Sequence, residues 1–166
     1  MKIDDDHMYY GAALLQIAED RRFTAINPLV VGGIVFENFF RINDNIIVSP
    51  KYCIKPKKPH SEYQFGFSFD NIESIKEIKK TQGNIFFALV CVEDRQICCL
   101  SSEELFRLIE QRIEKKGNQE DKYIVLVTVK AGESMRVYLN APGVKNTICG
   151  SRIVVPRNRF PAAIFD

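Results

Sequence analysis

A lysine-rich stretch in the first third of the chain has the residue types best suited to chemistry. Lys51 stands between apolar residues in IIVSPKYCIKPKK, and Lys55, Lys57 and Lys58 follow within eight residues, with no acidic residue before Glu62. Clustered amines with aromatic neighbours are suited to binding a phosphate backbone. The stretch therefore indicates a nucleic-acid partner, and a solvated charged loop is the alternative interpretation.

A second basic group lies near the end of the chain, in SRIVVPRNRF. It contains Arg152, Arg157 and Arg159. These three arginines could extend the lysine-rich surface if the fold brings the two segments together. Because the net charge is only +2, any attraction to a polyanion must come from such local clustering.

Composition limits the classes of protein to consider. The chain has 166 residues, of which 46% are hydrophobic, which is the size of one ordinary domain with a sizeable core. No apolar run approaches the roughly 20 residues that span a bilayer, and the first ten residues are acidic, unlike a secretory signal. We expect a soluble, cytoplasmic protein with no membrane association, in which the five cysteines are reduced core residues.

Hydrophobic periodicity predicts the elements that must position the basic residues. The spacing of apolar residues predicts a helix over 6–19, followed by three strands over 35–42, 46–53 and 63–69. A second helix is predicted to start at Asp70, with Glu73 as its capping partner, and to end before Gly83. A buried strand is predicted over 84–92. Pro50 inside the second strand requires a sheet edge or a bulge, because proline has no N–H to donate.

The second half is predicted to be a helix between two hairpins. The segment 96–100 pairs with the buried strand, Ser101 and Glu104 form a capping box for a helix that closes at Gly117, and 122–129 pairs with 134–140. The tail is mostly loop with a short strand at 153–155. We therefore predict an α+β single domain over 1–166, with a central mixed sheet flanked by about three helices. The order is αβββαβ over 1–100, followed by a hairpin, helix and hairpin extension over 101–166.

This order, with a lysine on the strand before a basic loop and the run YQFGFSFDNIESI…NIFFALVCVEDRQICCL, resembles the restriction-endonuclease-like, or PD-(D/E)XK, superfamily. The resemblance implies a Mg²⁺ ion held by carboxylates beside a catalytic lysine. By this resemblance, Lys51 takes the position of the catalytic lysine, Glu19 that of the acidic residue in the first helix, and Glu37 or Asp44 that of the metal-binding aspartate. The residue two before Lys51 is Ser49, where the family has an acidic ligand, and a hydroxyl is a poor substitute for a carboxylate.

The resemblance implies a nuclease-like nucleic-acid-binding protein of restriction or phage-defence type, with Mg²⁺-dependent phosphodiester cleavage as its activity where the site is complete. The alternative is a non-catalytic module that retains the fold and binds a protein partner or a second copy of itself. Glu19, Glu37 and Asp44 also suit ordinary positions on a helix surface, a strand and a turn.

Overall fold

The computed structural model describes residues 1–144 and 146–166. Its helices and strands follow in the order α1 (Asp5–Glu19), β1 (Ile26–Val31), β2 (Ile34–Ile42), β3 (Ile46–Cys53), β4 (Glu62–Ser68), α2 (Phe69–Gln82), β5 (Ile85–Cys91), β6 (Gln96–Ser101), α3 (Ser102–Lys116), β7 (Lys122–Thr128), β8 (Met135–Asn140), β9 (Ile148–Val155) and a short 3-10 turn, η1 (Ala162–Ile164). The predicted α+β fold with a mixed sheet is confirmed.

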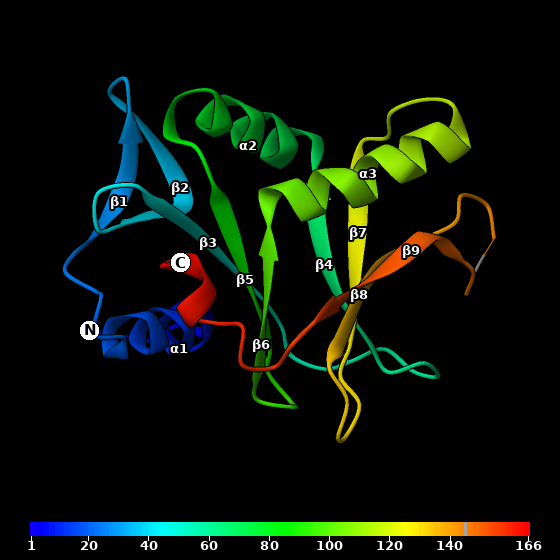
Figure 1. Ribbon diagram of the computed structural model, residues 1–166, viewed down its shortest axis with the longest axis horizontal. Helices are drawn as coiled ribbons and strands as arrows, with labels where there is room; N and C mark the ends of the chain where they lie inside the picture. Colours follow the sequence, from blue (N-terminus) through cyan, green and yellow to red (C-terminus); the bar gives the residue numbers. More distant parts are fainter. Residues whose placement is uncertain (145) are drawn as a thin grey trace.

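The strands form two sheets side by side (Figure 1). Sheet A has the order β1-β2-β3-β5-β6, and it is mixed because β3 and β5 run parallel while its other neighbours are antiparallel. Sheet B has the order β4-β7-β8-β9 and is antiparallel throughout. The third predicted strand, β4, therefore leaves the first sheet and pairs with β7 of the predicted extension.

Pro50 lies where β3 has lost its neighbour on one side. The pairing of β2 with β3 ends at Phe40 and Val48, whereas β3 stays paired with β5 from Ile47 to Cys53. Beyond Val48 that side of β3 is an edge, so the missing N–H of Pro50 breaks no ladder between β2 and β3. The expectation that Pro50 needs a sheet edge or a bulge is met by this open side of β3.

Sheet A is covered on both faces, as its apolar strands require. One face packs against α1 and the C-terminal segment through Ala13, Ile17, Phe160 and Ile164. The other face shares a larger core with α2, α3 and the inner face of sheet B; this core includes Ile47, Phe65, Ile75, Phe87, Leu105 and Val125. The cysteines are free thiols, and four of the five are buried.

Side-chain caps fix where the helices start. Asp4 caps α1 and Ser101 forms the expected capping box with Glu104 at α3. At α2 the prediction was wrong, because the cap is Ser68, whose hydroxyl accepts from the N–H of Asn71, and the helix starts before Asp70.

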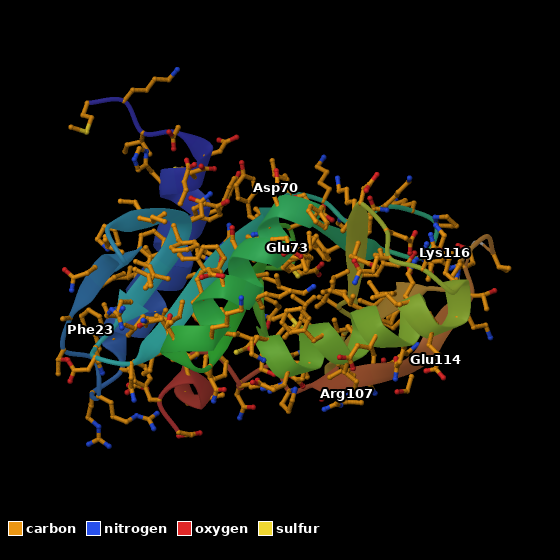
Figure 2. The ribbon with its side chains drawn as sticks, turned by 90° about the horizontal axis from the view of Figure 1, so that it is seen from above. Phe23, Asp70, Glu73, Arg107, Glu114 and Lys116 are labelled. Atoms are coloured by element: carbon orange, nitrogen blue, oxygen red, sulfur yellow. The ribbon has the colours of Figure 1, made fainter. Side chains whose placement is uncertain are left out.

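Helices α2 and α3 lie next to each other on one side of the molecule, where Glu73 and Arg107 are exposed (Figure 2). In the part of the chain that the structure describes, the helices are too short or too polar to cross a membrane.

Candidate functional site

Lys51 projects from β3 into the space between the two sheets. Successive side chains of a strand point to opposite faces, so Lys51 shares the inner face with Ile47 and Ser49. Its amine lies 4.6 Å from the centre of the Phe67 ring on β4. Burial, and to a smaller extent the charge of Lys122, lowers the pKa of Lys51 to about 8. A neighbouring carboxylate would raise this pKa instead.

The structure does not gather the three predicted acids around Lys51. Asp44 is exposed in the turn before β3, more than ~15 Å from Lys51 at about 3.3 Å per strand residue. Glu19 ends α1 on the opposite face of sheet A. The ring centre of Tyr9, in the first half of that helix, lies 4.8 Å from that of Tyr52, so Glu19 lies roughly 15 Å further along the helix axis.

Glu37 is the one predicted acid that lies toward the Lys51 end of β3. It is exposed in an irregular part of β2, next to Asn38, whose backbone φ is 63°. The carbonyl of Asn38 accepts a hydrogen bond of 2.9 Å from the Ser49 hydroxyl. Glu37 is therefore the sequence neighbour of the residue that contacts this part of β3, and Glu37 itself is exposed.

Ser49 is built into this junction as a hydrogen-bond donor. Its side chain is 2% exposed, and it points at a carbonyl oxygen. A carboxylate in its place would face that oxygen without a donor, so the position does not suit a metal ligand. Among the described residues there is also no group of three His, Cys, Asp or Glu side chains that could hold a metal ion. The residues at Lys51 therefore do not fit the Mg²⁺ that the resemblance implies.

A different set of basic residues converges on the outer face of sheet B. A hollow of about 130 Å³ lies between the β3–β4 loop, β7, β8 and β9. We call it the basic hollow and define it by His60, Glu62, Lys130, Tyr138, Asn140 and Arg152. Its three basic residues come from three separate segments of the chain, which the strand pairing of sheet B brings together.

Tyr138 organises the floor of the basic hollow. Its hydroxyl donates to the carboxylate of Glu62, and the Arg152 guanidinium lies 5.5 Å from the centre of its ring. Burial and the bond to Glu62 raise the pKa of Tyr138 well above its usual range. The phenol therefore stays protonated and keeps its hydrogen bond to the carboxylate of Glu62, while Arg152 beside it is exposed.

The predicted lysine loop borders this hollow. Lys55, Lys57 and Lys58 are exposed, and the backbone of Lys57 pairs with that of Glu62 through two hydrogen bonds of 2.9 and 3.1 Å. These bonds fold the loop back beside the hollow. The first predicted basic group and Arg152 therefore occupy one surface.

The other two predicted arginines serve the fold. Arg159 makes a bidentate ion pair with Glu104 of α3, at 2.8 and 3.1 Å. Arg157 donates to the carbonyl oxygens of Lys130 and Glu133 and so holds the β7–β8 turn. Both guanidinium groups are therefore held in place by contacts within the fold.

Sequence reasoning missed Lys130, Tyr138 and Asn140 as site residues. The alternation in SMRVYLN places Tyr138 and Asn140 on the same face of one strand. That pattern could have grouped them, but it does not say which face is the outer one. Their meeting with His60 depends on the pairing of β4 with β7, which joins residues 54 to 66 positions apart.

Comparison of the chain with protein-family models, with curated proteins and with solved structures gives no match.

Proposed function

We propose that this protein binds nucleic acid through phosphate contacts in the basic hollow and the adjoining lysine loop, without cleaving it. The observation that carries the proposal is the convergence of His60, Lys130 and Arg152 from three segments onto one outward-facing hollow. Phosphate binding requires cations that are exposed and clustered, and it does not require a metal. The absence of a fitting donor set at Lys51 argues against the nuclease activity.

Fluorescence polarisation with labelled 20-nucleotide single strands and 20-base-pair duplexes tests the proposal. We expect micromolar binding at 50 mM salt that weakens as salt is added. The double variant Lys130→Glu with Arg152→Glu should lose at least tenfold in affinity, and the salt slope should fall by about one per residue.

The matched control makes the same change in net charge elsewhere. Arg107→Glu with Lys115→Glu alters two exposed residues of α3, and we expect less than a threefold change. Absence of binding at low salt, or equal losses in both double variants, would refute the proposal. Incubation with Mg²⁺ or Mn²⁺ should leave the oligonucleotides intact; cleavage that Glu37→Ala abolishes would restore the nuclease interpretation instead.

A second function, self-association, is favoured by a separate observation on the β1–β2 hairpin. β1 is an edge strand of sheet A, and residues 23–36 contain no charged side chain. Val30, Ile34 and Val35 are at least half exposed. Edge strands are usually protected by charges, so an uncharged one is suited to pairing with the same strand of a second copy.

Light scattering over a range of protein concentrations tests this association. Val30 and Val35 are cross-strand partners, so Val30→Lys with Val35→Glu keeps the hairpin by an ion pair while removing its apolar face. A dimer in the native chain and a monomer in the double variant would support the function. A native monomer at every concentration would exclude it.

A further inference from the structure

Strands β7 and β8 separate halfway along sheet B. Their ladder ends at Leu126 and Tyr138. From there β7 stays paired with β4 as far as Lys122, and β8 stays paired with β9 as far as Asn140. A cavity of about 410 Å³ lies at this separation, which is large enough for a small planar ligand. We call this cavity the strand cleft.

The walls of the strand cleft are mostly apolar, with a few polar groups. Its apolar lining includes Ile124, Leu126, Leu139 and Ala141. Its polar lining is Gln64, Arg112, Lys122 and Asn140. The main-chain groups of β7 and β8 that face each other across the separation also lack a strand partner there. An apolar slot with hydrogen-bonding groups at its rim suits a flat heteroaromatic ring.

Asn140 lines the strand cleft and carries an amide whose hydrogen-bonding capacity is not fully used by the residues that the structure describes. Its main-chain carbonyl is held by Arg112 through a hydrogen bond of 2.6 Å. Its side-chain oxygen is buried and has no hydrogen-bond partner in the part of the chain that the structure describes. A buried polar atom without a partner is costly unless a ligand satisfies it. Asparagine amides are common partners for the hydrogen-bonding edges of nucleobases.

The two cationic side chains of the strand cleft, Arg112 and Lys122, have different environments. The other nitrogens of Arg112 donate to Glu120, so this guanidinium supports the wall and does not serve the ligand. Lys122 is exposed at the rim. Asn140 lines both the strand cleft and the basic hollow, so the two sites adjoin on the outer face of sheet B.

We propose that the strand cleft takes one unstacked nucleobase of a single-stranded nucleic acid, while the adjoining phosphates bind in the basic hollow. This inference rests on the nucleic-acid binding proposed above, and it specifies that the nucleic acid is single-stranded. A base in a duplex is stacked and paired and cannot enter a cavity within a sheet, whereas a base in a single strand can be splayed out.

Fluorescence polarisation with three probes of equal length tests the inference: an intact single strand, a strand that contains only abasic sugar phosphates, and a duplex. We expect the intact strand to bind roughly tenfold more tightly than the abasic strand, from the burial and hydrogen bonds of one base. Asn140→Ala should reduce the affinity for the intact strand to about the affinity for the abasic strand. Ile124→Trp, which fills the cleft from a residue 37% exposed, should do the same.

Val154→Trp is the matched control, because it adds an indole to an exposed residue of β9 that does not line the cleft. It should keep the preference for the intact strand. Equal binding of intact and abasic strands by the native protein, or no effect of either cleft variant, would overturn the inference while leaving phosphate binding in place. Binding of a nucleoside 5′-monophosphate as tight as that of the intact strand would overturn the assignment to a strand.

Failure of the proposed function has a different signature. In that case the abasic strand does not bind at 50 mM salt, and Lys130→Glu with Arg152→Glu changes nothing. Thermal unfolding of each variant checks that it folds. If Asn140→Ala does not fold, Ile124→Trp at the exposed rim decides the outcome.

Discussion

Lys51 holds a charge in surroundings that disfavour it. Its amine faces the ring of Phe67, burial lowers its pKa to about 8, and the unfolded chain has the ordinary value of 10.5. Between these two pH values the unfolded state binds a proton that the folded state does not. The free energy of unfolding contributed by this group therefore rises as the pH increases from about 8 to 10.5, and the destabilisation is fully present below pH 8.

Lys51→Met should consequently stabilise the protein at neutral pH. One pKa unit corresponds to about 1.4 kcal/mol, and partial solvation reduces the effect, so we expect a gain of about 1 to 3 kcal/mol at pH 7 that disappears by pH 10.5. Urea unfolding at several pH values measures it. Lys55→Met, an exposed lysine beyond the same strand, should change stability by less than about 0.5 kcal/mol. A loss of stability in Lys51→Met would contradict this account.

Ser49 stands where the resemblance would place an acidic metal ligand, and it has a structural role of its own. Its buried hydroxyl donates to the carbonyl of Asn38. Ser49→Ala should cost about 1 kcal/mol, the value of one hydrogen bond. Ser49→Asp should cost about 3 kcal/mol or more, because the carboxylate is buried against an acceptor. Thermal melts with and without Mn²⁺ test this; stabilisation of Ser49→Asp by Mn²⁺ would argue that a metal site can form there.

Among the elements, α3 is tied to the segment after β9 by one ion pair. Glu104 accepts from the N–H of Ser101 at 3.0 Å and from both terminal nitrogens of Arg159. Burial raises the pKa of Glu104, but the bonds from Arg159 and Ser101 outweigh it, and the net direction is downward. This carboxylate therefore contributes stability above its ordinary pKa of 4.5, and the contribution is lost as the pH falls through the lower folded value.

Glu104→Gln should cost about 2 kcal/mol at pH 7, because charged hydrogen bonds are worth more than neutral ones. The difference from the native protein should shrink as the pH falls below 4.5, the ordinary pKa of this carboxyl. Guanidinium unfolding at pH 7 and pH 3.5 measures both values. Glu103→Gln is the control in the same helical turn; its ion pair with Lys79 is more exposed, and its loss should cost less than about 1 kcal/mol. Equal effects at the two positions would contradict the importance of Arg159.

Local patterns predicted the elements well and their partners poorly. The capping box at Ser101 and the alternation of Tyr63, Phe65 and Phe67 identified α3 and β4, because both signals lie within a few neighbouring residues. The same alternation cannot say that β4 pairs with β7, since that choice is made between distant segments. The basic hollow was out of reach for the same reason, although Arg152 and the lysine loop had each been singled out.

At the scale of the whole molecule, the C-terminal segment completes the core on the α1 face. Phe160 is 6% exposed and packs in a cluster with Ala13 and Ile17 of α1. Phe160→Ala should cost about 3 to 4 kcal/mol and should increase hydrogen exchange in α1. Phe69→Ala, at a phenylalanine that is 49% exposed, should cost less than about 1 kcal/mol. If the hydrogen-exchange rates of α1 in the Phe160→Ala variant equal those of the native protein, this cluster does not stabilise the helix.

The membership of β4 in sheet B has a consequence for synthesis on the ribosome. Tyr63 of β4 pairs with Val127 of β7, so more than sixty further residues must be translated before this strand finds its neighbour. Until then the nascent chain carries an apolar strand with two open edges, which is a template for misassembly. Slow translation through β5, β6 and α3 would prolong that interval, and a chaperone that shields extended apolar segments would shorten the exposure.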